Sequence, residues 1–208
     1  MQACKWIIGA TPYLDLVHAA WAAAFPQETI EKITLAQNAR HQFDLAPLNQ
    51  LDPTQGSIFV AFDERFGNFK RAELMQAVME RGFKLESFVS PRASVADNVK
   101  VGINTFIGDG VTVGYGSRID FNNTLLAGAH IGNGVHIRPS CWIEPGVIIG
   151  NEVQIGMHCT VRSGALVAPT VQVGRYCELG WPQRYAKNIA AKTYFDSRYS
   201  ETIHTYEN

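Results

Sequence analysis

The sequence predicts an α/β domain followed by an all-β parallel β-helix, and two repeating patterns carry the second part of that prediction. From Val89 to Leu179 an aliphatic residue occupies every sixth position. Four residues after each of these stands a second series, mostly small or β-branched, that runs from Ala93 to Cys177. A period of six fits neither an α-helix nor a hairpin sheet, but it fits a β-helix with three short strands per coil. The run is long enough for about five coils, stacked at roughly 4.8 Å each.

Glycine often follows the aliphatic position, as at Gly102, Gly108 and Gly150. A glycine tolerates the tight backbone of a corner, where a larger residue would be strained or would clash. The aliphatic series therefore fills the interior, the small series fits beside it, and the glycines turn the chain.

Three of the four cysteines fall on the small inward series, 18 residues apart, at Cys141, Cys159 and Cys177. Four cysteines in a chain of 208 residues are too few for a disulfide scaffold. A metal-binding or redox column is the functional interpretation of this spacing. The pattern favours small buried hydrophobic residues, because the repeat requires a side chain of that size at that point.

The first 88 residues lack the six-residue period and alternate between strand and helix patterns. The expected strands are Lys5–Ile8, Thr29–Leu35 and Ser57–Phe62, and the expected helices are Leu14–Phe25 and Phe69–Arg81. Residues 36–55 carry no clear element. This order predicts a small open α/β domain over 1–88, followed by the β-helix over 89–180. An aromatic-rich tail, 181–208, is expected to pack on the prism or on a neighbouring subunit.

Composition excludes several classes of protein. The net charge is −1 with both signs spread along the chain, so we expect no nucleic-acid partner. The start, MQACKWIIGA, lacks the pattern of a signal peptide, and no stretch approaches the ~18 apolar residues of a membrane span. We therefore expect a cytoplasmic protein without membrane insertion.

The repeat also predicts which side chains face outward on the three flat faces of the prism. The three outward columns are Ser94, Thr112, His130, Ile148, Leu166; Lys100, Arg118, His136, Gln154, Gln172; and Phe106, Thr124, Trp142, Thr160, Glu178. Phe106, Trp142, Ile148 and Leu166 are apolar residues that a monomer would expose. They predict a self-association surface, most simply in a closed cyclic homotrimer.

Several stretches of the chain resemble the PglD/NeuD-type hexapeptide acyltransferases of bacterial surface-glycan synthesis, over roughly residues 3–184. The most similar stretches are 7–10 (Ile-Ile-Gly-Ala), 60–65, 83–93, 123–124, 131–137 and the ending Gly180-Trp181-Pro182-Gln183-Arg184. The resemblance implies a Rossmann-like N-terminal domain, a left-handed parallel β-helix and a trimer. It also implies transfer of an acetyl group from acetyl-CoA to a sugar, commonly a nucleotide-linked amino sugar. In that family the nucleotide sits in the N-terminal domain and CoA lies between two adjacent β-helices.

The chain departs from the family at the catalytic position. The family's general base is a histidine at the place of Ala127, and its acidic neighbours are replaced here by Leu126 and Gly128. The family's nucleotide loop, Gly-x-x-Gly-His, reads Gly9-Ala10-Thr11-Pro12-Tyr13. The absence of a histidine favours N-acylation over O-acylation, because an alcohol needs a base far more than an amine does.

The resemblance and the expected coil geometry together give three sets of candidate residues. CoA binding is assigned to His136, to coil backbone near Met157 and Leu166, and to Arg184. Acceptor binding is assigned to Ala10, Thr11 and Pro12. Proton removal is assigned to His130, to Asp109 through water, or to the departing CoA thiolate.

Each candidate also has a structural interpretation. His130 and His136 would then be surface or interface residues, Asp109 would hold a turn, and Arg184 would be solvated. No metal is expected, because His130, His136 and His158 are spaced six and 22 apart and fall in different columns, unlike the zinc ligands of γ-type carbonic anhydrases. The alternative function is a catalytically inactive trimeric binding or scaffold protein, which would explain the loss of both the base and the nucleotide loop.

Overall fold

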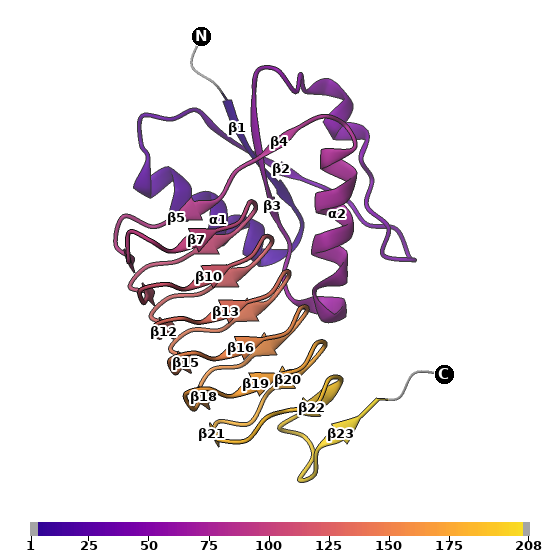
Figure 1. The fold of residues 1–208 in the computed structure, drawn as a ribbon. Helices are drawn as coiled ribbons and strands as arrows, with labels where there is room; N and C mark the ends of the chain where they lie inside the picture. Colours follow the sequence, from indigo (N-terminus) through magenta and orange to yellow (C-terminus); the bar gives the residue numbers. More distant parts are fainter. Residues whose placement is uncertain (1–3, 206–208) are drawn as a thin grey trace.

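The computed structural model describes residues 4–205, in which an N-terminal α/β part lies at one end of a long three-sided prism (Figure 1). The N-terminal part contains β1 (Cys4–Gly9), α1 (Thr11–Ala24), β2 (Ile30–Thr34), η1 (Ala46–Gln50), β3 (Gly56–Ala61), η2 (Arg65–Asn68), α2 (Phe69–Met79) and β4 (Lys84–Leu85). The four strands form one parallel sheet in the order β2-β1-β3-β4. The predicted strands and helices of this part are confirmed, with shifts of a few residues at their ends.

The two helices cover opposite faces of the sheet, because side chains alternate along its strands. Ile7 and Phe59 pack in the cluster that contains the buried side of α1. Ile8 and Val60, one residue later in each strand, pack in the cluster that contains the buried side of α2. The sheet is therefore buried on both faces, which explains the continuous apolar runs of β1 and β3.

The segment 36–55 has more structure than its sequence pattern predicted. An isolated bridge joins Gln37 to Phe43, and the 3₁₀ helix η1 follows with Leu48 buried in the core. Short elements of this kind carry no periodic signal. The prediction that residues 36–55 contain no clear element was therefore wrong.

The prism consists of short strands on three flat faces, and within the regular coils each strand pairs in parallel with strands 18 residues away, as His136 does with Arg118 and Gln154. The His136 face contains β7 (Lys100–Val101), β10 (Arg118–Ile119), β13 (His136–Ile137), β16 (Gln154–Ile155) and β19 (Gln172–Val173). The His130 face contains β6 (Ser94–Val95), β9 (Thr112–Val113), β12 (His130–Ile131), β15 (Ile148–Ile149), β18 (Leu166–Val167) and β21 (Arg184–Tyr185). The third face, here called the covered face, contains β5 (Phe88–Val89), β8 (Phe106–Ile107), β11 (Thr124–Leu125), β14 (Trp142–Ile143), β17 (Thr160–Val161), β20 (Glu178–Leu179), β22 (Thr193–Phe195) and β23 (Ile203–His204).

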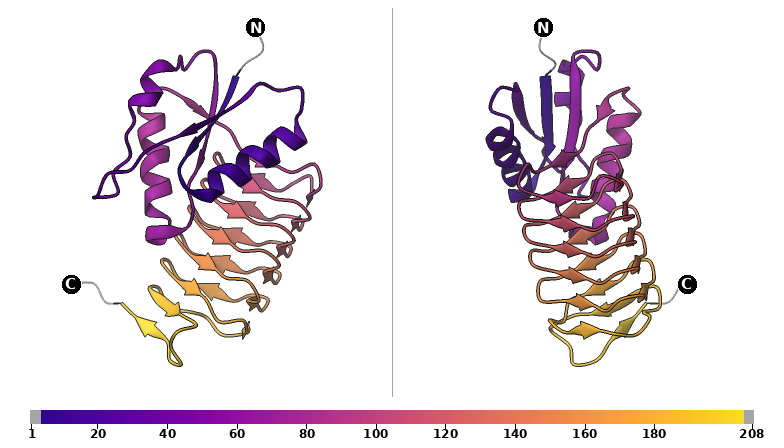
Figure 2. Two further views of the ribbon diagram at one scale, coloured as in Figure 1. Left: turned by 180° about the vertical axis from the view of Figure 1, so that it is seen from behind. Right: turned by 60° about the vertical axis from the view of Figure 1, so that its left-hand side comes forward.

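The strand pairing confirms the three outward columns and the inward aliphatic series. Side chains of that series, such as Ile107, Leu125 and Ile143, are fully buried in one continuous core. The inward cysteines lie in the same core, so their interpretation as small buried residues is consistent with the packing. These mostly parallel sheets agree with a left-handed β-helix (Figure 2).

The prediction that Phe106 and Trp142 are exposed on a monomer was wrong. Their exposed fractions are 2 % and 5 %, because α1 lies across the upper coils of the covered face (Figure 2). The Tyr13 ring packs edge-on against Trp142, with ring centroids 4.8 Å apart, and its hydroxyl lies 3.1 Å from Thr124 Oγ1. Of the four apolar residues proposed for self-association, Ile148 is 44 % exposed and Leu166 is half-buried.

Arg71 of α2 joins the N-terminal part to the prism from inside the junction. Its side chain is buried and donates to the backbone carbonyls of Phe62, Asn122 and Cys141 at 3.1–3.3 Å. The guanidinium also lies 5.4 Å from the centre of the Trp142 ring. Burial lowers the pKa of Arg71, although its surroundings partly oppose this. The three carbonyls come from both parts of the chain, so this one side chain ties them together.

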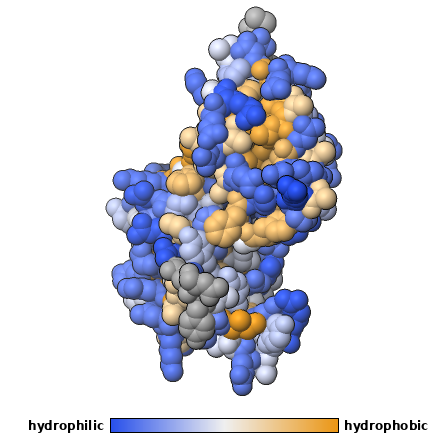
Figure 3. Space-filling model, turned by 90° about the vertical axis from the view of Figure 1, so that its right-hand side faces the viewer, coloured by the Kyte–Doolittle hydropathy of each residue, from blue (hydrophilic) through white to orange (hydrophobic). Residues whose placement is uncertain are grey.

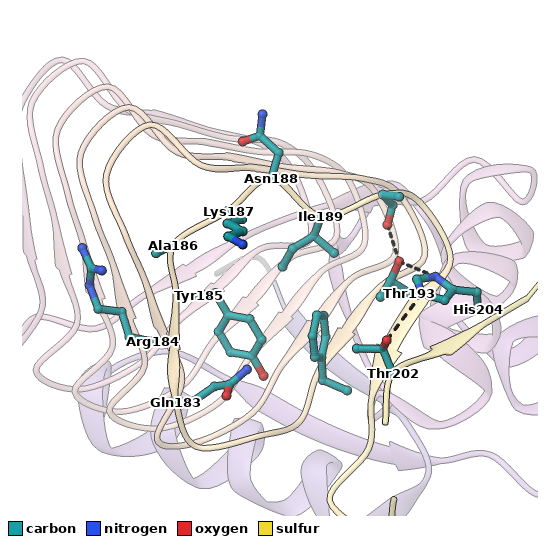
Figure 4. Close-up of a pocket in the computed structure, with 12 residues that line it drawn as sticks. Gln183, Arg184, Tyr185, Ala186, Lys187, Asn188, Ile189, Thr193, Thr202 and His204 are labelled. Carbon is teal, nitrogen blue, oxygen red and sulfur yellow. Dashed lines mark hydrogen bonds between the residues drawn. The ribbon is translucent and has the colours of Figure 1, made fainter. Parts of the chain in front are cut away.

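The C-terminal segment continues the stack beyond Leu179. β21 pairs with β18, β22 pairs with β20, and β23 adds an antiparallel strand at the end of the covered face. An open cavity of about 530 Å³ lies at this end of the prism, and Tyr185, Ile189 and Thr193 are among its lining residues (Figure 4). The prediction that the tail packs on the prism is confirmed for the described residues. The division of the chain at 88 and 180 remains our proposal.

None of the helices in the described part of the chain is both long and apolar enough to cross a lipid bilayer. On the side that α2 faces, the apolar surface gathers on the N-terminal part and its junction with the prism, and the prism below is mostly hydrophilic (Figure 3).

Candidate functional site

His136 forms a hydrogen-bonded pair with Asp120 on the His136 face. Its Nε2 lies 2.9 Å from Asp120 Oδ2, and the two side chains are 18 % and 10 % exposed. Arg118 Nε donates to the other carboxylate oxygen at 2.6 Å. Partial burial acts to raise the pKa of Asp120, but the hydrogen bonds from Arg118 and His136 outweigh it and lower the pKa below its ordinary value. Asp120 therefore stays ionised and fixes the orientation of the imidazole.

This pair determines which nitrogen of His136 is available for chemistry. A carboxylate accepts hydrogen bonds, so the Nε2 of His136 carries the hydrogen and Nδ1 carries the lone pair in the neutral ring. The arrangement is suited to accepting a hydrogen bond from an amide of a ligand, or to holding a proton.

Two grooves flank the pair along the same face. One, of about 660 Å³, is lined by Arg138, Gln154, Gly156, Gln172 and Asn188 among others. The other, of about 360 Å³, is lined by Lys100, Arg118, Asp120 and neighbouring backbone. Lys100, Arg118 and Arg138 are cations on this face; Asp120 offsets the charge of Arg118, and the remaining positive charge favours an anionic ligand.

A second region is the corner at Ala127, where the family would have its base. Gly128 N donates to Asp109 O at 2.9 Å, so Asp109 and Ala127 lie on adjacent coils at the same corner. The Asp109 carboxylate accepts from Arg92 and from Ser90 Oγ, the latter at 2.5 Å. These hydrogen bonds, with that of Arg92 the stronger, lower the pKa of Asp109. A carboxylate held ionised in this way is a weak base near neutral pH.

A cavity of about 220 Å³ lies at this corner. Its lining is Leu16, Ala20, Phe88, Phe106, Gly108, Asp109, Leu126, Ala127 and Pro145. A second cavity of about 230 Å³ adjoins it and shares Ala20 and Asp109, with Ser90, Pro91 and Arg92 as further lining. The first cavity is mostly apolar, and the second has ionic lining at Arg92 and Asp109.

His130 is exposed on the His130 face, and its Nδ1 lies 2.9 Å from Thr112 Oγ1. It is absent from the lining of the cavity that contains Asp109 and Ala127. The structure of one chain therefore does not bring His130 and Asp109 together as a catalytic pair.

The candidate CoA residues are divided between two faces and a corner. Leu166 and Arg184 are neighbours on the His130 face, where their strands pair. His136 lies on another face, and Met157 is 38 % exposed at the corner that follows β16. One ligand could contact all four only between two copies of the chain.

The candidate acceptor residues Ala10, Thr11 and Pro12 lie where β1 enters α1. Gly9 packs so closely on Ala61 that an added Cβ would come within 1.8 Å of its carbonyl oxygen. Thr11 has a positive φ of 76°, which is strained for a β-branched residue, and its Oγ1 is buried without a hydrogen-bond partner. This strand–helix turn is tight, and it sits at the amino end of a 14-residue helix.

His158 packs against an aromatic side chain of α2. Its ring stacks on Phe69, with ring centroids 4.3 Å apart, and burial lowers its pKa. Within residues 4–205 no group of three or more His, Cys, Asp or Glu side chains is placed to hold a metal ion.

Asp120 is a candidate site residue that the sequence analysis did not single out. It precedes His136 by 16 residues, so it falls just outside the 18-residue register that links stacked positions. A search for side chains 16 residues apart could have found this pair, because a side chain at the corner after one strand can reach the strand of the next coil.

The comparisons agree with this architecture. The model of the bacterial transferase hexapeptide family (six repeats) matches residues 136–169. Curated proteins give no match. Solved structures with a similar fold include a mutant of perosamine N-acetyltransferase from Caulobacter crescentus in complex with CoA and GDP-perosamine, with 21 % identity, TM-score 0.83, and 98 % of each chain covered.

Two further structures are similar over nearly the whole chain. The acetyltransferase domain of PglB from Neisseria gonorrhoeae, in complex with acetyl coenzyme A, has 22 % identity and a TM-score of 0.60, with 98 % of this chain and 100 % of that chain covered. WeeI from Acinetobacter baumannii has 14 % identity and a TM-score of 0.66, with 97 % and 100 % covered. The chain therefore carries the bacterial transferase hexapeptide repeat on the same fold as these three structures.

Proposed function

We propose that this protein is an acetyl-CoA-dependent acyltransferase that acylates the amino group of a sugar, nucleotide-linked, in surface polysaccharide biosynthesis in the cytoplasm. The observation that carries the proposal is the His136–Asp120 pair between two grooves on a cationic face. The likeness of the whole chain to structures that contain CoA, acetyl coenzyme A and GDP-perosamine supports it.

The proposal places CoA on the His136 face, with its phosphates near the cations of the grooves and its pantetheine along the coil backbone. The free Nδ1 of His136 can accept a hydrogen bond from a pantetheine amide. Leu166, Arg184 and Met157 reach the same ligand if they come from a neighbouring copy. This requirement supports a closed homotrimer of parallel prisms, in which each site lies between two subunits.

The acceptor belongs at the N-terminal part, near Ala10, Thr11 and Pro12. The amino end of α1 offers backbone N–H groups and the positive end of the helix dipole to a phosphate. We assign the N-terminal part as Rossmann-like on the basis of its parallel sheet with a helix on each face.

The geometry at Ala127 favours an amine acceptor. The amine forms a C–N bond with the acyl carbon, the C–S bond breaks, and the amine proton goes to the departing thiolate to give free CoA. Asp109, held by Arg92 and Ser90, would orient the amine through water rather than remove its proton. His130 would act only if it comes from a neighbouring copy, since it is absent from the cavity of its own chain.

Calorimetric titration of acetyl-CoA into the purified protein tests this proposal. We expect one site per chain with about micromolar affinity. The variant His136→Phe should weaken the affinity about tenfold, whereas His204→Phe, at the far end of the prism, should leave it unchanged. Binding should be followed by thiol release with an amino-sugar nucleotide and not with its hydroxyl analogue. Absence of heat at high concentration from a folded protein would refute the proposal and favour a non-catalytic binding or scaffold protein.

A further inference from the structure

The cavity at Ala127 has the size and chemistry of an acyl-chain pocket. It measures about 220 Å³, and it lies between α1 and the prism corner that contains Ala127. Leu16 and Ala20 of α1 form one wall, and Phe88 and Phe106 form its floor. Leu126, Ala127 and Pro145 of the prism corner complete it. Alanine at 127 keeps this space open.

Polar groups do not explain the cavity. Among its lining residues Asp109 is the one with a titratable side chain, and its carboxylate is already bonded to Arg92 and Ser90. A sugar ring in this space would lose the hydrogen bonds of its hydroxyl groups to water without replacing them, at a cost of a few kcal/mol. A hydrocarbon chain loses nothing of that kind and gains from burial.

We propose that this cavity receives the acyl chain of the donor, and that the donor range extends beyond acetyl to chains of about four to six carbons. If each carbon takes up the ~30 Å³ that a water molecule occupies in the liquid, such a chain needs about 120 to 180 Å³. The cavity of about 220 Å³ can supply this space, whereas an acetyl group would leave most of it unfilled. This inference rests on the proposed function, because the thioester must reach the corner at Ala127.

The test is a series of binding measurements with acetyl-, butyryl- and hexanoyl-CoA. Each methylene buried in an apolar pocket should tighten binding by up to about fourfold. Hexanoyl-CoA should therefore bind at least tenfold more tightly than acetyl-CoA, and its acyl group should be transferred to the amine acceptor. Octanoyl-CoA, which exceeds the cavity, should gain nothing further.

Two variants on one helix provide a matched comparison. Ala20→Leu places a larger side chain in the wall of the cavity, and Ala22→Leu places the same side chain on the exposed side of α1. Ala20→Leu should remove the preference for hexanoyl-CoA and leave acetyl-CoA affinity within about twofold, whereas Ala22→Leu should keep the preference. Ala127→Leu, at an exposed corner of the prism, should give the result of Ala20→Leu without altering α1.

The outcomes separate this inference from the function on which it rests. Equal affinity for acetyl- and hexanoyl-CoA in the native protein would overturn the acyl pocket and leave a CoA-dependent enzyme. A preference for hexanoyl-CoA that survives both Ala20→Leu and Ala127→Leu would place the chain elsewhere and would also overturn it. Failure of every CoA thioester, and of CoA itself, to bind would refute the proposed function as a whole.

Discussion

The Nε2 of His136 lies 2.9 Å from the Oδ2 of Asp120, although the two residues belong to successive coils of the prism. The pair exists because Asp120 stands at the corner that follows β10, while His136 lies on β13 directly alongside β10. A rigid stack of coils holds both ends of this contact, so the imidazole is oriented before any ligand arrives.

Asp120 makes stability depend on pH in a defined direction. Its pKa is lower in the folded chain than in the unfolded chain, so its contribution is fully present above the unfolded value of about 4 and is lost as pH falls through the folded value. We expect Asp120→Asn to lower the melting temperature at pH 7, and the difference from the native protein to shrink between about pH 4 and pH 2. Thermal scans across this range check it, with Asp97→Asn at an exposed corner as the control. A difference that stays constant down to pH 2 would contradict the assignment.

Ala127→His tests the corner at Ala127 by adding an imidazole where the chain has a methyl group. An imidazole placed there would fill part of the cavity and stand one coil away from Asp109. We expect thiol release with acetyl-CoA to rise or stay level, and the binding of longer acyl-CoA molecules to weaken by at least fivefold. Unchanged binding of every chain length and no change in rate would show that this corner takes no part in the reaction.

Arg71 should contribute strongly to the stability of the junction. Truncation by Arg71→Ala removes a fully buried side chain and leaves the carbonyls of Phe62 and Asn122 without their side-chain donor. We expect a loss of about 3 kcal/mol in the free energy of unfolding. Denaturant titration measures it, and Arg81→Ala at the exposed end of the same helix should change it by less than about 0.5 kcal/mol. Equal effects of the two changes would mean that the junction does not depend on Arg71.

Ile148 should lie between subunits if the proposed trimer is correct. It is 44 % exposed on the His130 face, and a charge placed there would have to be buried on assembly. We expect Ile148→Lys to sediment as a species of one chain mass, 23.0 kDa, where the native protein sediments at three times that mass. Met79→Lys, equally exposed at the end of α2, should remain trimeric. A native protein that sediments as a monomer would contradict the assembly itself.

The sequence predicts the parts of this molecule that depend on spacing alone. The 18-residue register places His130 beside Ile148 and Asp109 beside Ala127, because a parallel coil allows no other alignment. The burial of Phe106 and Trp142 could not be predicted in this way, since it depends on where α1 comes to rest. The contact between Asp120 and His136 was missed for a related reason, because it joins a corner to a face rather than two stacked positions.

One buried cluster spans the N-terminal part and the prism, and in it Ile7 and Trp21 pack with Phe88 and Trp142. A swing of one part toward the other would have to break this packing, which opposes closure over a substrate by that motion. A change in which substrate the protein binds would then come from single side chains along the junction between the two parts. Helix α1 stabilises this junction and also forms one wall of the cavity at Ala127, so substrate choice is linked to the stability of the whole chain.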